Sequence, residues 1–331
     1  MQEEFDFIAI GDVVTDEFIE LDPEQAVVHK DEAGRKKLTM NFGDKLPYQG
    51  AVNVPAVGNS PNAAVSATRL GLRTALVTHV GNDEGGEEIK QQLAQNGVDQ
   101  SFVQTQEGKE SNHHYVLRYG PERTILIKHE AYDYSFPDVG TPKWLYFSSV
   151  GEDSLPYHHE IAEYVRSHEG TKLAFQPGSF QIRLGYETLK DIYEMCELFF
   201  CNAEEAMTIL GHQERDVKAL LRGMHEKGVT MPVITDGPDG AYVLEGETVW
   251  HMPMYPDPAP PVDRTGAGDS FSSTFTSCLA LGMSVPDALA RAPINSMSVV
   301  QYIGAQEGLL SMEAIEEHLA RAPEGYQAKA V

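Results

Sequence analysis

The chain has 331 residues, of which 50 are Asp or Glu and 25 are Lys or Arg, so its formal net charge is −25 at pH 7. Apolar residues make up 41% and aromatic residues 9%, which is typical of a globular protein with one large domain, or with one large and one small. Such acidity excludes binding to nucleic acid through a basic stripe and binding to an anionic membrane surface. A phosphate-bearing ligand would have to be held by backbone amides, a local cation or a metal.

The start of the chain and its cysteines predict a cytoplasmic protein. The first five residues, MQEEF, lack the basic region of a signal peptide. No stretch reaches the roughly 18 consecutive apolar residues that a transmembrane helix needs. The three cysteines, Cys196, Cys201 and Cys278, fit neither a disulfide framework nor a C-x-x-C metal site. We therefore expect buried, reduced thiols.

Short apolar strands alternate with amphipathic helices along most of the chain. The pattern predicts strands at 5–10, 74–78, 144–148, 173–175, 198–201 and 232–235. It predicts helices at 62–70, 87–95, 158–167, 217–226 and 272–281. This alternation indicates an α/β fold with a doubly wound, mostly parallel sheet that helices cover on both faces.

Two segments interrupt this alternation. Residues 15–57 and 102–134 carry no clear helical period and contain alternating apolar stretches, two of which are separated by the turn-like Gly120-Pro121-Glu122. We expect antiparallel strands there, forming a small β-sheet lid over the ends of the parallel strands. The α/β domain would then comprise residues 1–14, 58–101 and 135–331.

Several common enzyme signatures are absent from the sequence. It contains no G-x-x-x-x-G-K-[ST] phosphate loop, no G-x-G-x-x-G after the first strand, no H-E-x-x-H and no G-x-S-x-G. The paired histidines, His113-His114 and His158-His159, are adjacent and so point to different faces of a strand or helix. These observations disfavour a dehydrogenase and a zinc hydrolase.

The strongest local pattern is Asp263-Arg264-Thr265-Gly266-Ala267-Gly268-Asp269, just before the predicted helix 272–281. A Gly-rich turn that opens a helix presents free amides and the positive end of the helix dipole to an anion. Gly266, Ala267 and Gly268 carry little side chain to obstruct it. An acid at Asp269 competes with that anion, unless it takes a proton from a hydroxyl that attacks phosphorus. A plain helix start with an acidic first turn is the alternative interpretation.

A second pattern, Gly58-Asn59-Ser60-Pro61-Asn62, precedes the predicted helix 62–70. Gly58 and Asn59 suit a tight turn, and Asn59 and Asn62 offer amide donors and acceptors for hydroxyl groups. Helix capping by Ser60 or Asn59 would explain the same residues. Further along, Gln176-Pro177-Gly178 follows a strand and is expected to face the crevice at the carboxyl edge of the sheet.

Together the two patterns resemble the paired signatures of the PfkB or ribokinase family of sugar and nucleoside kinases. The resemblance covers nearly the whole chain and includes five further features in the family's order. These are Gly11 to Asp16, Arg69-Leu70-Gly71 with Val80 to Gly86, Asn202-Ala203-Glu204-Glu205, Thr235 to Gly240, and Gly304-Ala305-Gln306.

The resemblance implies an ATP-dependent kinase that phosphorylates a hydroxymethyl group of a sugar. Asp269 would be the catalytic base, and the amides of Gly266, Ala267 and Gly268 would form an anion hole. The acceptor residues would be Asp16, Gly58, Asn59 and Asn62. The nucleotide residues would be Asn202, Thr235, Gly237 and Asn295.

The resemblance also implies two cations and a dimer. Glu205, helped by Asn202, would order water around Mg²⁺, although a helix cap followed by first-turn acids explains this pair equally well. A K⁺ ion is expected near Asp263 and Thr265. The lid would close over the substrate and pair with a second subunit.

Some residues depart from the family pattern and leave the acceptor open. Val14, Val57 and Arg264 replace the more frequent Asn, Gly and Thr, which argues against ribose itself. The long first lid segment and the polar, aromatic stretch from His113 to Arg118 could instead serve a nucleoside, as in an adenosine-type kinase. A non-catalytic metabolite-binding protein on the same fold is the other alternative, and the intact GAGD sequence argues against it.

Overall fold

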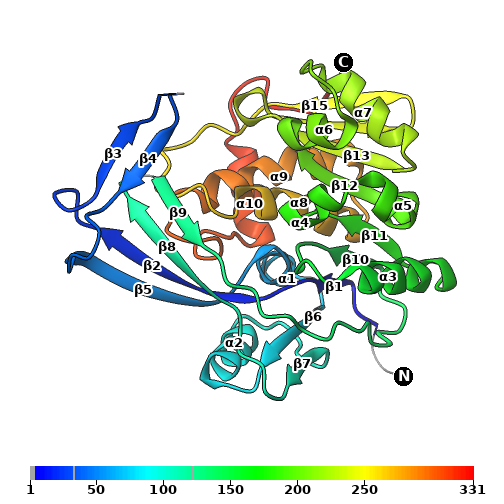
Figure 1. The fold of residues 1–331 in the computed structure, drawn as a ribbon. Helices are drawn as coiled ribbons and strands as arrows, with labels where there is room; N and C mark the ends of the chain where they lie inside the picture. The colour runs from blue at the N-terminus through cyan, green and yellow to red at the C-terminus, as the bar shows by residue number, and fades with distance from the viewer. Residues whose placement is uncertain (1–3, 33, 121) are drawn as a thin grey trace.

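The computed structural model describes residues 4–32, 34–120 and 122–331 (Figure 1). Its large sheet has ten strands, of which the seven from β13 to β7 run parallel and the remaining three antiparallel. In spatial order they are β16 (Lys329–Ala330), β15 (Thr248–Met252), β14 (Ala241–Glu245), β13 (Met231–Thr235), β12 (Cys196–Asn202), β11 (Lys172–Phe175), β10 (Trp144–Phe147), β1 (Phe7–Ile10), β6 (Thr74–Gly81) and β7 (Val103–Gln106). The predicted mostly parallel sheet is confirmed.

Helices cover both faces of this sheet, because its strands are apolar on both sides. In β1, Phe7 and Ala9 belong to one core and Ile8 and Ile10 to the other. The first core is closed by α1 (Asn59–Arg69), α2 (Glu84–Gln95), α8 (Ala267–Ala280) and α9 (Val285–Val299). The second is closed by α3 (Leu155–Ser167), α5 (Tyr186–Met195), α6 (Ala203–Leu210) and α7 (Val217–Glu226). The short α4 (Ser179–Leu184) follows β11, and α10 (Met312–Ala320) packs against α9.

The lid is a separate four-stranded sheet that projects to one side of the large domain (Figure 1). Its strands, in order, are β5 (Tyr48–Val57), β2 (Val14–Leu21), β8 (His113–Tyr119) and β9 (Glu122–Leu126). A hairpin of β3 (Val27–Lys30) and β4 (Lys36–Thr39) extends it. Pro121 of the predicted turn and the first three residues of the chain lie outside the described residues.

The lid differs from the prediction in two respects. β2 and β8 are parallel, so the sheet is mixed and not antiparallel throughout. Both strands leave the large domain side by side, where the Thr15 amide donates to the Asn112 carbonyl, and so they run in the same direction. In addition, Val103 to Gln106 form β7 of the large sheet, so the second lid segment begins later than residue 102.

The register of the lid strands assigns their side chains to two faces. Asp16 pairs with His114 and Arg118 with Arg123, so these four side chains share one face. Tyr115 is the register partner of Leu126 and lies on the opposite face. The Arg123 guanidinium reaches Asp263 in the large domain, 3.4 Å away. The face that carries Asp16 is therefore the one turned toward the large domain.

The described helices are short. The longest, α9, has 15 residues, and within the part of the chain that the structure describes no helix combines the length and hydrophobicity needed to cross a bilayer. The three cysteines are free thiols in the core, as expected. Burial raises the pKa of all three, which keeps them protonated at neutral pH.

Candidate active site

The predicted site residues come together at the carboxyl edge of the large sheet. Gln176, Asn202 and Thr235 stand at the ends of the adjacent strands β11, β12 and β13. The N-termini of α1 and α8 meet them there. Both helices begin earlier than predicted, at Asn59 and Ala267, because each polar or Gly-rich stretch forms the first helical turn. This places Asn59, Asn62 and Asp269 on helices.

The Asp269 carboxylate is the centre of this cluster. It is only 8% exposed and lies in the first turn of α8. Three side-chain amides donate to it: Asn59 at 2.7 Å, Gln176 at 3.0 Å and Asn62 at 2.8 Å, the first two to Oδ1 and the third to Oδ2. With both oxygens occupied by amide donors, the Asp269 side chain is fixed in one orientation.

Neighbouring groups determine which way two of these amides point. The Gln176 Oε1 atom accepts from the Tyr146 hydroxyl and from Ser272, which leaves its amide nitrogen for Asp269. The Asn62 Oδ1 atom accepts from Gln306 Nε2 at 3.0 Å, with the same result. Gln306 is itself held from α1, where Arg69 donates to the carbonyls of Gln306 and Leu309, both at 2.8 Å.

The loop before α8 depends on a glycine and a carboxylate. Gly266 has a φ of +79°, and a Cβ atom there would lie 2.4 Å from the Ala305 Cβ. The Asp263 carboxylate accepts hydrogen bonds from Thr265 N at 2.9 Å, Thr265 Oγ1 at 2.7 Å and Gly304 N at 3.1 Å. Burial raises the pKa of Asp263, but these hydrogen bonds and Arg123 outweigh it and hold the pKa below its usual value. Asp263 therefore ties this loop to the C-terminal loop.

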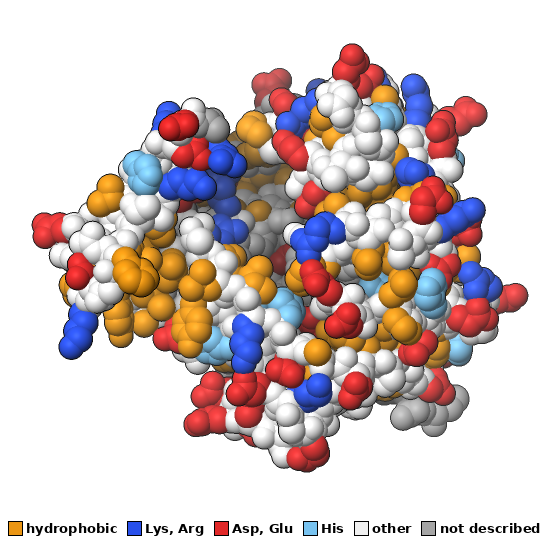
Figure 2. Space-filling view, viewed as in Figure 1, with side chains coloured by type: hydrophobic (Ala, Val, Ile, Leu, Met, Phe, Trp, Pro, Cys, Tyr) orange, Lys and Arg blue, Asp and Glu red, His pale blue; other side chains and the backbone are white. Residues whose placement is uncertain are grey.

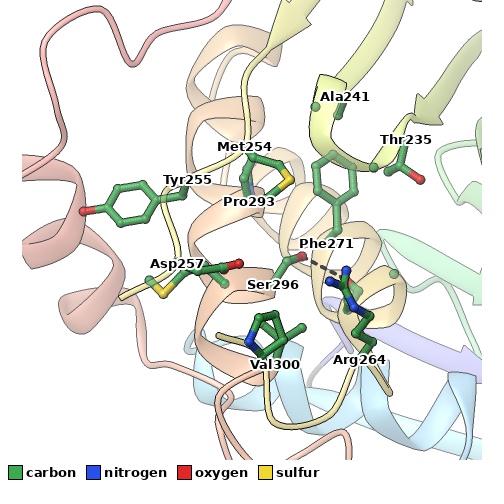
Figure 3. Close-up of a pocket in the computed structure, with 16 residues that line it drawn as sticks. Thr235, Ala241, Met254, Tyr255, Asp257, Arg264, Phe271, Pro293, Ser296 and Val300 are labelled. Atoms are coloured by element: carbon green, nitrogen blue, oxygen red, sulfur yellow. Dashed lines mark hydrogen bonds between the residues drawn. The ribbon is translucent and has the colours of Figure 1, made fainter. Parts of the chain in front are cut away.

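One cavity lies between the ends of β13 and β14 and the helices α8 and α9 (Figure 3). Its walls are mostly apolar, with Phe271 and Pro293 on the two helices and Met254 on the segment that follows β15. Arg264 enters it from the loop before α8, so one of the three residues that depart from the family pattern faces this cavity. Thr235 and Gly237, which the family resemblance suggested for the nucleotide, both line this cavity. A flat, largely apolar ligand group fits such a lining.

A second, more polar cavity adjoins the first. It is lined by Asn59, Gln176, Asn202 and Glu205, among others. The two cavities share Thr235, Gly268 and Phe271 in their walls. The N-terminus of α8 therefore stands at the junction between an apolar cavity and a polar one, next to Asp269. The crevice position predicted for Gln176-Pro177-Gly178 is confirmed, because all three residues line the polar cavity.

Asn202 and Glu205 form the helix cap that the sequence allowed. Glu205 N donates to Asn202 Oδ1 at 2.8 Å, and Asn202 N donates to Glu205 Oε2 at 2.9 Å. Burial raises the pKa of Glu205, against the hydrogen bond from Asn202. Among the described residues no group of three or more His, Cys, Asp or Glu side chains is placed to bind a metal. A cation held here would therefore keep water among its ligands, which suits Mg²⁺.

Asn295 does not line the apolar cavity. Its side chain is fully buried between helices, where it donates to Thr274 Oγ1 at 2.8 Å and accepts from Leu310 N at 2.9 Å. The next residue, Ser296, takes the cavity position and donates to the Ala267 carbonyl at 2.8 Å (Figure 3). The family resemblance suggested Asn295 for the nucleotide, but on α9 its side chain points between helices and that of Ser296 reaches the cavity.

The remaining predicted acceptor residues lie on the lid side of Asp269. Gly58 caps α1 with a φ of +120°, and a Cβ atom there would lie 3.0 Å from the Asp12 carbonyl. Asp16 lies on β2 and contacts His114 Nδ1 at 3.3 Å. Near them is a group that the sequence did not indicate. The Tyr134 hydroxyl and His129 Nδ1 contact the buried Asp12 carboxylate at 2.9 and 3.1 Å. The cluster of Asp12, His129 and Tyr134 is visible only in the structure, because no sequence motif links these three positions.

Comparison with known proteins identifies the family. The model of the pfkB family carbohydrate kinases matches residues 32–312. The chain belongs to this family. This kinase is 26% identical over 260 residues to the fructoselysine 6-kinase of Escherichia coli, which covers 75% of this chain and 90% of that protein. It is 25% identical over 315 residues to the nucleoside kinase of Methanothermobacter thermautotrophicus, which covers 93% and 94%.

A solved structure supports the fold of the kinase. The Arabidopsis thaliana ribokinase complexed with ribose and ATP superposes with a TM-score of 0.78 at 18% identity, covering 96% of this chain and 99% of that one. The ribokinase-like fold expected from the sequence is thereby confirmed.

Proposed function

We propose that this kinase transfers the γ-phosphoryl group of ATP to a hydroxymethyl group of a sugar. The observation that carries the proposal is the position of Asp269, an oriented carboxylate at the junction of an apolar and a polar cavity. The apolar cavity would hold the nucleotide, with Thr235 and Gly237 at its edge. ATP as donor is supported by the ribokinase similar to this chain, whose structure contains it.

Each group at the junction has a task in this reaction. Asp269 takes the proton of the acceptor hydroxyl while the hydroxyl oxygen attacks the γ-phosphorus. The bond between the γ-phosphorus and the bridging oxygen then breaks, and that oxygen leaves with ADP. The first amides of α8, at Gly266, Ala267 and Gly268, donate to the charge that builds on the transferring group. Mg²⁺, when bound, neutralises charge on the ATP phosphates, and Glu205 with Asn202 would order its water ligands.

The acceptor would bind between Asp269 and the lid. Asn59 and Asn62 on α1, Gly58 before them and Asp16 on β2 border that space. Within the lid stretch that suggested a nucleoside, His113 and Tyr115 lie on the face opposite Asp16, whereas His114, Val116 and Arg118 share its face. Most of the aromatic character of this stretch is thus turned away from the acceptor, which favours a sugar over a nucleoside. Closure of the lid would exclude water, which competes with the acceptor for the phosphoryl group.

A direct test measures ADP release with MgATP over a panel of sugars and nucleosides. We expect turnover on a sugar with a free hydroxymethyl group, and loss of that turnover in Asp269→Asn. Turnover on nucleosides alone would show that the acceptor is a nucleoside and not a sugar. If the protein binds ATP and phosphorylates no acceptor in a broad panel, the kinase proposal is wrong and the fold serves as a metabolite-binding protein.

Replacement of Glu205 by Gln is expected to raise the Mg²⁺ concentration needed for half-maximal rate about 10–100-fold. The amide retains the cap to Asn202 N but removes the charge that orders the metal's water. Because burial raises the pKa of Glu205, the parent enzyme should also need more Mg²⁺ as the pH falls through that raised pKa, whereas the variant should not. Mg²⁺ titrations at several pH values measure both effects.

The matched control is Glu204→Gln, one residue earlier. Its carboxylate is largely exposed and pairs with Arg215, so its Mg²⁺ requirement should match the parent's. If Glu205→Gln has the Mg²⁺ requirement of the parent at every pH, the metal role of Glu205 is wrong and the residue is a cap alone.

We also propose a homodimer formed through the lid. Tyr115 and Leu126 are register partners on the lid face away from the site, and they are 44% and 52% exposed. Hydrophobic side chains gather on the lid in Figure 2. Burying such a face against a second copy would remove it from water.

Light scattering after size-exclusion chromatography tests the dimer. We expect the mass of two chains for the parent and of one chain for the double variant Tyr115→Glu with Leu126→Glu. Leu281→Glu, at an equally exposed apolar position at the end of α8, should leave the dimer intact. A parent protein with the mass of one chain at micromolar concentration would contradict this assembly.

A further inference from the structure

The surroundings of Asp263 differ from those of a cation-binding carboxylate. This side chain is nearly buried, and its Oδ1 atom lies 3.4 Å from the Arg123 guanidinium. Thr265 donates to the same Oδ1 atom through its backbone amide and its hydroxyl, and Gly304 N donates to Oδ2. A carboxylate has about four lone-pair sites. Four donors from this chain therefore already surround Asp263, one of them a permanent cation.

A monovalent cation does not fit this arrangement. A cation needs oxygen lone pairs directed toward it, whereas the groups that converge on Asp263 are N–H and O–H donors. An arginine is charged at every pH at which proteins are folded, and its guanidinium satisfies the carboxylate electrostatically and through hydrogen bonds at once. The K⁺ that the family resemblance suggested beside Asp263 and Thr265 would have to displace Arg123.

We propose that Arg123 of the lid, and not a monovalent cation, supplies the positive charge beside Asp263 and so holds the anion-hole loop in its working position. Arg123 lies at the start of β9, 140 residues before Asp263 in the chain, and comes from the lid face that carries Asp16. Asp263 in turn connects Thr265, one residue before Gly266, with Gly304, one residue before Ala305. Arg123 is thus a positioning residue that acts through Asp263, and its charge reaches the loop only while the lid stands near the large domain.

This arrangement gives the lid a second task. A cation bound from solution would stabilise the loop whether the lid is open or closed, because its binding to Asp263 would not depend on the position of the lid. A guanidinium on β9 stabilises the loop only in lid positions that bring the two within contact, so the anion hole is held most firmly when the acceptor is covered. The inference rests on the proposed kinase function for its meaning, but its cation requirement can be measured without any acceptor.

The first experiment compares K⁺ with tetramethylammonium, which is too large for a carboxylate site, at equal ionic strength. For the parent we expect turnover within about twofold in the two salts, and the same melting temperature in both. For Arg123→Gln we expect turnover about 3–30-fold lower, the range of a moderate coupling between a remote residue and a site. The loss should appear in kcat more than in the KM for either substrate, because Arg123 acts through Asp263 on the loop before α8.

Restoration of the missing charge separates a cation role from general damage. Added guanidinium at low millimolar concentration, or K⁺ entering the vacated place, should recover part of the lost kcat in Arg123→Gln and leave the parent unchanged. Either cation should also raise the melting temperature of the variant and not that of the parent. Arg291→Gln removes an arginine that pairs with Glu316 on the far helix α10, and it should show neither the loss nor the recovery.

The outcomes distinguish this inference from the proposed function. Activation of the parent by K⁺ of tenfold or more, or a K⁺-specific rise in its melting temperature, would overturn the inference, as would an Arg123→Gln variant with full kcat and no cation response. If no acceptor is phosphorylated, the kinase proposal fails, and the melting temperatures of parent and variant in the two salts still decide which cation stands beside Asp263.

Discussion

Replacement of Asp269 by Asn is expected to lower turnover by about 10²–10⁴-fold, the usual contribution of a positioned general base. The variant removes the proposed proton acceptor but nearly keeps the size of the side chain. Its new NH₂ group faces amide donors from Asn59, Gln176 and Asn62, so one of these must turn away, at a cost of about 1–3 kcal/mol in stability. Steady-state ADP formation, nucleotide titration and thermal melting measure turnover, ATP affinity and fold separately.

The matched control for this variant is Asp287→Asn. Asp287 is the third residue of α9, as Asp269 is the third residue of α8, but it is not part of the site. Both variants lose an acid from the first turn of a helix, which costs about 0.3–1 kcal/mol of dipole interaction. Only Asp269→Asn should lose turnover. If it retains near-parent turnover with its fold intact, Asp269 is not the base.

Replacement of Gly266 by Ala should abolish most activity, by about 10²-fold or more, and should also lower stability. An added Cβ atom would lie 2.4 Å from the Ala305 Cβ and 2.7 Å from its Cα, so one of the two loops must move. The loop that moves carries either the anion-hole amides or Gln306, which orients Asn62 toward Asp269. Loss of a single donor to the developing charge is already worth about 10²–10³-fold. Kinetics and denaturant unfolding of the purified variant measure the two effects.

Gly282→Ala separates the close approach from backbone strain. Gly282 follows α8 with a φ of +83°, close to that of Gly266, but a Cβ atom there has no neighbour within 4 Å. Both variants carry the cost of a left-handed alanine, about 1–2 kcal/mol, and only Gly266→Ala adds a steric conflict in the site. Equal activities for the two variants would show that the approach of the two loops is unimportant.

The alternation of apolar strands and amphipathic helices along the sequence predicted the large sheet and its helices well. The apolar strands of the large sheet are buried on both faces, so their runs could be recognised without knowledge of their partners. The lid was harder, because strand direction is set by where each strand leaves the large domain and not by its own residues. The segment Val103 to Gln106 was predicted to lie in the lid for a different reason. It is a short, half-buried edge strand, and such a strand resembles a lid strand in sequence.

For the candidate site, the sequence indicated the residues that lie in motifs. It did not indicate the residues that join the site only through contacts with distant parts of the chain. Asp269, Asn59 and Asn62 could be chosen because Gly-rich or polar turns open their helices. Gln306 lies in a loop that was recognised, but its bond to Asn62 joins positions 244 residues apart, and no periodicity encodes such a contact. The apolar cavity wall at Met254 and Pro293 has no signature, since these residues look like ordinary core in the sequence.

The C-terminal loop accepts hydrogen bonds from Arg69 and donates one, from Gln306, to Asn62, and these contacts bear on the order in which this protein can become active during synthesis. All seven parallel strands are complete once residue 235 has been made, so much of the sheet can assemble early. The amide that orients Asn62 arrives about seventy residues later, near the end of the chain. A nascent or C-terminally shortened chain would therefore hold a nearly finished scaffold in which one of the three amide donors to Asp269 is not yet oriented.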